Sequence, residues 1–191
     1  LQKKLEAEAS SEFNLVASSA GAGAYDKPAF TRHIVNTRTA ASIDYNRLYL
    51  WVLLTYDRVY GLNRPASYYF KEPYASRVQA NGRHALINVS FNEALTDSFK
   101  KAVQNGTDTD FIKAVQDNDI HDWKPVTPTR LYHGDADNTV FYFNTQNAYE
   151  AMRKQGATNV ALFRLPGRNH GSGILDFVLG TFEFFNSKQT Q

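Results

Sequence analysis

Two strand-like segments, each followed by a helix-like segment, occupy the last third of the chain. TRLYH (residues 129–133) precedes NTQNAYEAMRKQG (144–156), and NVALFRL (159–165) precedes GILDFVLGTFEFFNS (173–187). Residues 129–133 and 159–165 are short and apolar, as buried strands are. Residues 144–156 and 173–187 have the length of helices. This order and spacing are typical of a parallel β-sheet covered by helices. The sequence therefore predicts an α/β fold in this region.

Acidic and imidazole side chains follow the two predicted strands directly. The first strand runs into HGDADNTV, which contains Asp135 and Asp137, and the second runs into PGRNHGSG, which contains His170. Chemistry in such folds is located in the loops past the carboxyl ends of the strands. A carboxylate and an imidazole placed there are the orienting acid and the general base that nucleophilic catalysis uses. Taken singly, each would be a helix-capping aspartate or a loop histidine, but together they predict a catalytic pair.

A longer motif surrounds these residues. Residues 123–140 read W-K-P-x-x-P-x-x-L-x-H-G-x-x-D-x-x-V, followed by A-x-x-A-M-x-x-x-G-A and then by N-H-G. This pattern resembles the carboxyl-terminal part of the α/β-hydrolase fold, nearest to bacterial secreted lipases, esterases and prolyl-oligopeptidase-like hydrolases. The resemblance implies that Asp137, three residues after Gly134, is the acid of a catalytic triad and that His170 is the base. Phe141 departs from the pattern, because many relatives carry proline there.

The first part of the chain is interpreted as one more strand of the same sheet. Residues 1–30 are expected to hold the tail of a helix and then an apolar strand, EFNLVAS (residues 12–18), which ends at the following glycines. The stretch from residue 26 to 36 is expected to be a loop, because Pro28 is excluded from a helix interior.

A helical cap, or lid, is expected at residues 31–120, inserted before the last two strand–helix units of residues 121–191. Capped helices are predicted at residues 43–60, 90–106 and 108–119. The first of these is rich in aromatic residues, which favours packing inside the cap over direct contact with an acyl chain.

Ser19 lies in the segment ASSAG (residues 17–21), which fits the relaxed small-x-Ser-x-Gly pattern of a nucleophile elbow. An elbow needs neighbouring strands and an oxyanion-hole N–H from an earlier loop, and the 18 preceding residues are too few to supply them. Pro28 would also interrupt the helix that should follow an elbow. We therefore expect Ser19 at a strand-end turn and the nucleophilic serine upstream of residue 1, with Ser19 as nucleophile the alternative.

The composition argues against several other functions. Lys and Arg total 21 against 19 for Asp and Glu and are scattered, so a nucleic-acid surface is not indicated. The longest apolar run, residues 48–55, is much shorter than the roughly 20 residues of a membrane span. The chain has no cysteine. Three of its five histidines, His33, His84 and His121, are dispersed, and DADNT lacks the glycine and glutamate of a calcium loop. Neither a metal nor a cofactor is expected.

These observations predict the carboxyl-terminal part of a serine hydrolase that acts on carboxylic esters or lipids by acyl transfer and is inactive without its upstream segment. A peptidase-type serine hydrolase remains open, as does a non-catalytic hydrolase-like module that binds an apolar partner or a glycan. The expected sheet would be completed by the upstream segment or by another chain, because open strand edges recruit partners. An extracellular or periplasmic location is implied by the resemblance alone.

Overall fold

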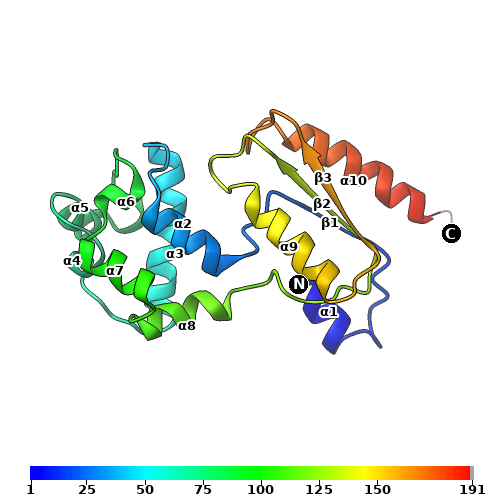
Figure 1. Ribbon diagram of the computed structural model, residues 1–191, viewed down its shortest axis with the longest axis horizontal. Helices are drawn as coiled ribbons and strands as arrows, with labels where there is room; N and C mark the ends of the chain where they lie inside the picture. The colour runs from blue at the N-terminus through cyan, green and yellow to red at the C-terminus, as the bar shows by residue number, and fades with distance from the viewer. Residues whose placement is uncertain (190–191) are drawn as a thin grey trace. The chain divides into compact units, whose positions relative to one another are not determined.

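The computed structural model describes residues 1–189 and divides into two compact units (Figure 1). The first, here called the sheet unit, consists of Leu1–Asp26 and of the chain from Asp119 onward. The second, here called the helical unit, is Lys27–Asn118. The helical insertion predicted from the sequence is residues 31–120.

The sheet unit contains three parallel strands in the order β1-β2-β3. Their bounds are β1 (Ser18–Gly21), β2 (Thr129–Gly134) and β3 (Val160–Leu165), and the helices of this unit are α1 (Gln2–Glu8), α9 (Phe143–Lys154) and α10 (Ile174–Gln189). Gly134 pairs with Leu165, so β2 and β3 end at the same level. The predicted α/β fold with a parallel sheet is confirmed.

The two long helices of the sheet unit pack on opposite faces of the sheet (Figure 1). Successive side chains of a strand point to opposite faces. On one face, Leu131 of β2 joins a core cluster with Ala148 and Met152 of α9. On the other, Tyr132 packs edge-on against Phe177 of α10, with ring centroids 5.7 Å apart. The sheet is therefore the middle layer between α9 and α10, and its central strand β2 is buried.

The first strand was predicted too early in the sequence. Residues 12–17 form no strand, and β1 consists of the small residues Ser18–Gly21. Small side chains are needed there because α10 lies close: a Cβ on Gly21 would come within 3.0 Å of the Phe177 ring. Apolarity alone pointed to the preceding segment, in which Phe13 and Val16 are 57% and 56% exposed.

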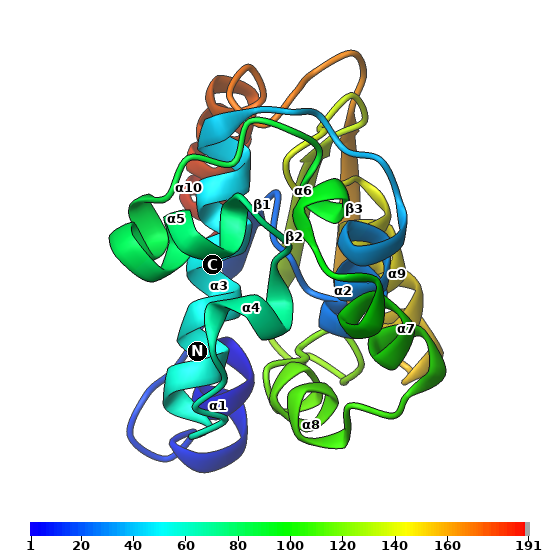
Figure 2. The same cartoon turned by 90° about the vertical axis from the view of Figure 1, so that its left-hand side faces the viewer.

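The helical unit consists of helices only (Figure 2). They are α2 (Lys27–Asn36), α3 (Ile43–Val59), α4 (Ala66–Tyr69), α5 (Tyr74–Asn81), the 3-10 helix η1 (Gly82–His84), α6 (Phe91–Ala94), α7 (Asp97–Asn105) and α8 (Thr109–Asp117). Ser42 caps α3 and Asp108 caps α8, each by accepting a backbone N–H, as their side chains allow.

Two predictions in this region are wrong. The stretch from residue 26 to 36 contains the helix α2 rather than a loop, because Pro28 lies in the first turn, where its missing N–H costs nothing. The single helix predicted at residues 90–106 is two helices, α6 and α7. It breaks where Leu95 forms an antiparallel bridge with Phe70, and Thr96 then caps α7.

The core of the helical unit is aromatic. Tyr69 and Phe99 pack edge to face with ring centroids 5.1 Å apart, and Phe99 packs in the same way on Phe111 at 5.2 Å. Tyr49 of α3 is buried, whereas Trp51 on the same helix is 51% exposed. The aromatic residues of α3 are thus divided between the core and the surface. No helix within residues 1–189 has both the length and the apolar character that crossing a membrane requires.

Arg64 and Asp108 form the best-enclosed ion pair of this unit. The guanidinium donates two hydrogen bonds of 2.6 Å to the two carboxylate oxygens, and the Asp108 side chain is 1% exposed. Asp108 also accepts from Tyr68 and from the backbone N–H of Phe111. Burial would raise the pKa of Asp108, but the hydrogen bonds from Arg64 and Tyr68 hold it below its ordinary value.

Replacing Asp108 should therefore destabilise the helical unit. Asp108→Ala leaves the Arg64 guanidinium without its partner and removes the α8 cap, which should lower the free energy of unfolding by about 3 kcal/mol. Asp110→Ala, at an exposed position of the same helix, is the matched control and should change it by less than about 0.5 kcal/mol. Urea unfolding measures both, and equal effects would contradict this account.

Candidate active site

Asp137 lies in the loop between β2 and α9 and is held by the backbone that follows it. Its Oδ1 accepts hydrogen bonds from the N–H groups of Thr139 (2.9 Å) and Val140 (3.0 Å). An aspartate readily closes such a turn on its own backbone. Because these two bonds hold Oδ1 and the side chain is fully buried, the position of the second oxygen, Oδ2, is also fixed.

His170 lies in the loop between β3 and α10, at the tip of a small turn. The N–H groups of Gly171 and Ser172 donate to Oδ1 of Asn169, at 3.1 and 2.9 Å. In return, the N–H of Asn169 donates to the Ser172 hydroxyl at 2.9 Å. These reciprocal bonds hold the His170 backbone, while its side chain is 40% exposed.

The structure brings Asp137 and His170 together. Nδ1 of His170 lies 2.7 Å from Oδ2 of Asp137. The hydrogen bond to Asp137 raises the pKa of His170 above its ordinary value, against the opposing effect of burial. Burial would raise the pKa of Asp137, but the hydrogen bonds from His133, His170 and Thr139 lower it well below its ordinary value. Asp137 is therefore ionised, and Nδ1 of His170 carries the shared proton.

His133, the last residue before Gly134 in β2, also contacts the carboxylate. Its Nε2 lies 3.2 Å from Oδ2 of Asp137 and 2.6 Å from the carbonyl oxygen of Val140. Because both neighbours are acceptors, Nε2 carries a hydrogen and donates. Its Nδ1 faces the Thr145 hydroxyl at 2.5 Å. From its place at the strand end in the motif H-G-x-x-D, His133 is expected to be packed and to line the site; its contact with the Asp137 carboxylate is found only in the structure.

Backbone contacts fix the acid loop against the histidine loop. The N–H of Ala136 donates to the carbonyl of Arg168 (3.0 Å), and the N–H of Asp135 donates to that of Leu165 (3.2 Å). Gly134 is required at this crossing, because a Cβ there would collide with the Arg168 carbonyl. The Asp135 side chain binds the end of β3 and the loop after it rather than His170: it accepts from Arg164 at 2.8 Å and from the N–H of Gly167 at 2.6 Å.

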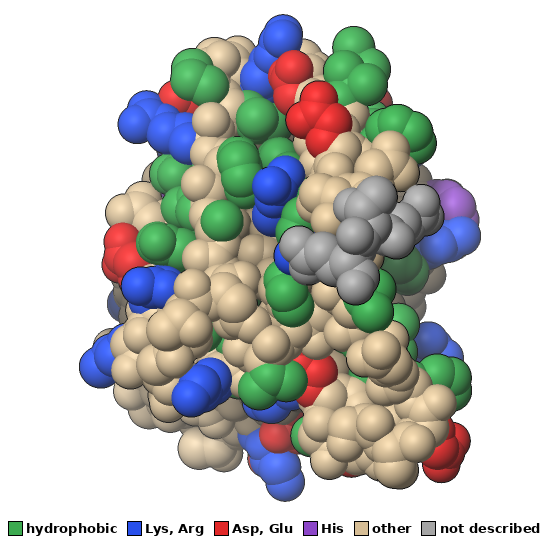
Figure 3. Space-filling model, turned by 90° about the vertical axis from the view of Figure 1, so that its right-hand side faces the viewer, with side chains coloured by type: hydrophobic (Ala, Val, Ile, Leu, Met, Phe, Trp, Pro, Cys, Tyr) green, Lys and Arg blue, Asp and Glu red, His purple; other side chains and the backbone are tan. Residues whose placement is uncertain are grey.

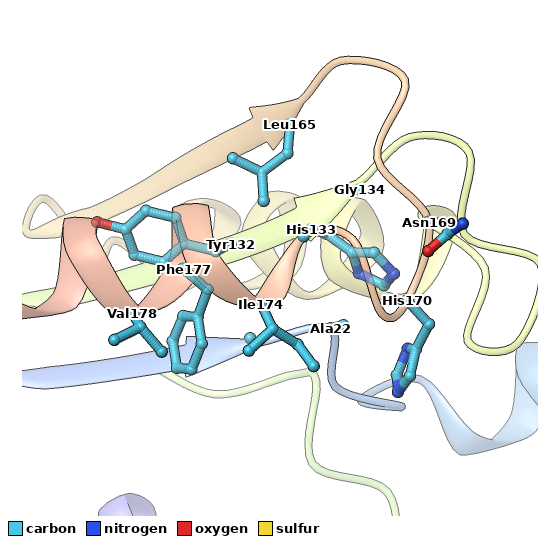
Figure 4. Close-up of a pocket in the computed structure, with 12 residues that line it drawn as sticks. Ala22, Tyr132, His133, Gly134, Leu165, Asn169, His170, Ile174, Phe177 and Val178 are labelled. Atoms are coloured by element: carbon cyan, nitrogen blue, oxygen red, sulfur yellow. The ribbon is translucent and has the colours of Figure 1, made fainter.

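A pocket of about 220 Å³ opens beside His170 (Figure 4). Its walls are mostly apolar and come from the ends of the strands and from the first turns of α10. The lining residues labelled in Figure 4 include Ala22, Tyr132, Leu165, Ile174, Phe177 and Val178. The pocket can therefore hold a small apolar group next to the imidazole.

Ser19 does not have the geometry of a nucleophile elbow. It lies inside β1, opposite Arg130, rather than at a strand-end turn, and the next helix begins only at Lys27. Its Oγ is 2.6 Å from the Thr181 hydroxyl of α10. Within residues 1–189, no serine or threonine hydroxyl forms a hydrogen bond with His170.

The sheet and its two loops define the class of fold. Two parallel strands each lead through a loop into a covering helix, an aspartate of the first loop bonds a histidine of the second, and a helical unit is inserted after β1. This arrangement is that of an α/β-hydrolase fold, as the sequence predicted.

Solved structures show the same fold. The chain is similar to the rice cell wall degrading esterase LipA from Xanthomonas oryzae, with a TM-score of 0.72, 22% identity, and coverage of 93% of this chain and 50% of LipA. It is also similar to a candidate hydrolase from Legionella pneumophila, with a TM-score of 0.78, 17% identity, and coverage of 100% and 52%. The chain thus spans about half the length of both. No known protein-family model and no curated protein matches the sequence.

The pKa of His170 should depend on Asp137 and not on Asp135. Asp137→Asn removes the negative charge that stabilises the imidazolium, so the pKa of His170 should fall from above about 6.5 to that value or lower. Asp135→Asn is the matched control and should move it by no more than a few tenths. Histidine ring NMR over a pH series measures both, and a larger shift with Asp135→Asn would contradict the assignment.

Proposed function

We propose that this chain is the acid- and base-bearing part of a serine hydrolase that cleaves carboxylic esters by acyl transfer. Asp137 is the orienting acid and His170 the general base, and the nucleophilic serine belongs to a segment upstream of Leu1. The observation that carries the proposal is the 2.7 Å hydrogen bond between the buried Asp137 carboxylate and Nδ1 of the half-exposed His170.

The geometry supports these roles. With Nδ1–H donated to Asp137, Nε2 is the nitrogen that can take a proton from a serine hydroxyl and return it to the leaving alcohol. The carboxylate fixes that tautomer and stabilises the imidazolium formed on the way, and the raised pKa of His170 reflects this stabilisation. His133 and two backbone N–H groups hold the carboxylate in place.

An ester substrate is favoured by the pocket and by the fold comparison. The apolar pocket beside His170 suits the acyl or alcohol group of a small ester. LipA, one of the proteins with a similar fold, is an esterase that degrades rice cell wall, which also supports a reaction outside the cytoplasm.

The surface of the sheet unit supports a further segment that completes the sheet. One side of α10 presents apolar side chains to solvent, namely Leu175, Val178, Leu179 and Phe182, each at least half exposed. Figure 3 shows hydrophobic side chains exposed among charged and other groups on the face that it draws. Surfaces of this kind mark contacts with other protein. Within the described residues β1 pairs with β2 alone, so its other edge can accept a strand. We assign both surfaces to the segment that carries the serine.

Active-site labelling tests the proposal. The 191-residue chain and the same chain extended by its natural upstream segment are treated with a fluorophosphonate, which reacts with an activated serine. The extended protein should be labelled and the chain alone should not. His170→Ala should slow labelling and ester hydrolysis by about 10²- to 10⁴-fold, because it removes the general base.

Two controls make the outcome decisive. His84→Ala, at an exposed histidine of the helical unit, and Ser19→Ala should both leave labelling of the extended protein unchanged. Ester turnover by the chain alone that disappears with Ser19→Ala would reinstate Ser19 as nucleophile. No labelling of a folded extended protein would favour a hydrolase-like binding module.

A further inference from the structure

A second group of titratable side chains lies in the sheet unit, at the point where the chain leaves this unit and returns to it. Asp26 is the last residue before the helical unit, and Asp119 and His121 are among the first residues after it. The two chain segments are joined by a backbone hydrogen bond of 3.2 Å from the N–H of Ile120 to the carbonyl of Tyr25.

The three side chains converge. Nδ1 of His121 lies 2.8 Å from both carboxylate oxygens of Asp119, and its Nε2 lies 4.0 Å from Oδ2 of Asp26. One ligand atom from each residue lies within 4.8 Å of the other two. The imidazole is therefore placed between two carboxylates.

The three side chains of the cluster are largely buried. The Asp26 side chain is 10% exposed, and those of Asp119 and His121 are 21% and 23% exposed. Asn147 of α9 donates from its side-chain nitrogen to Oδ2 of Asp26 at 2.8 Å. Hydrogen bonds of this kind orient ligating carboxylates in metal sites, and the exposed side leaves room for water.

We propose that Asp26, Asp119 and His121 bind a divalent transition-metal ion of the Zn²⁺ type. One imidazole and two carboxylates suit such an ion, whereas Ca²⁺ prefers oxygen ligands alone. Zinc bonds of about 2.0–2.1 Å place ligand atoms roughly 3.4 Å apart, so these ligand atoms, which lie within 4.8 Å of one another, move closer together when the ion binds. The metal lies between the two carboxylates and joins the two chain segments that flank the helical unit.

The histidines alone did not reveal this site, because His33, His84 and His121 are far apart in the sequence. The partner carboxylates come from the two ends of the helical insertion, and only folding brings them together. The inference does not depend on the proposed hydrolase function, since it concerns other residues.

Metal binding to the 191-residue chain tests the proposal. Titration calorimetry with ZnCl₂ should give one site, and CaCl₂ should bind at least about 100-fold more weakly. His121→Gln and Asp26→Asn should each weaken zinc binding by about 10- to 100-fold or more. Zinc should raise the melting temperature of the wild-type chain and not that of these variants.

Matched variants separate this site from the other histidines. His84→Gln and His170→Ala should leave the tight site intact. In the wild-type chain, substoichiometric MnCl₂ should broaden NMR signals first around residues 26 and 119–121, a readout that needs no variant. The proposal is overturned if zinc does not bind, if His121→Gln leaves binding unchanged, or if the broadening centres on His170 instead.

Discussion

The parallel pairing of β2 with β3 is the constraint on which the rest of the sheet unit depends. Their register ends both strands at the same level, Gly134 beside Leu165, so the two following loops leave the sheet side by side. The backbone bonds to the Arg168 and Leu165 carbonyls then join the loops. The 2.7 Å hydrogen bond between Asp137 and His170 therefore depends on this strand register, because the two residues are far apart in the sequence.

The helices make this arrangement rigid from both faces. On the α9 side, Thr145 forms a hydrogen bond with His133, and His133 donates to Asp137. The helix α9 therefore helps to hold the carboxylate in place. On the α10 side, the close approach of Phe177 favours a glycine at the end of β1. The same approach shapes the apolar pocket beside His170. Phe177 therefore both packs against the sheet and lines the pocket beside His170.

The sequence predicted the last third of the chain well because its signals are long and consistent. Each of β2, α9, β3 and α10 has a clear apolar pattern, and Asp137 and His170 could be found because they follow strand ends. Features that depend on tertiary contacts were not predicted from the sequence. In β1, Gly21 lies directly against Phe177 of α10, and the helices α6 and α7 are separated where Leu95 pairs with Phe70. His133 gained its role only through side chains brought near by folding.

A double-mutant cycle between Asp137→Asn and His170→Gln tests the central claim most directly, that these loops form a charged pair. Because the folded pKa of His170 is raised, the pair stabilises the fold fully below its unfolded value of about 6.5, and that stability is lost as pH rises through the folded value. Urea unfolding should give a coupling energy of about 1–2 kcal/mol near pH 5.5, reduced for the partial exposure of His170, and a smaller one near pH 8.5. A coupling near zero at both pH values, or a larger one at the higher pH, would contradict it.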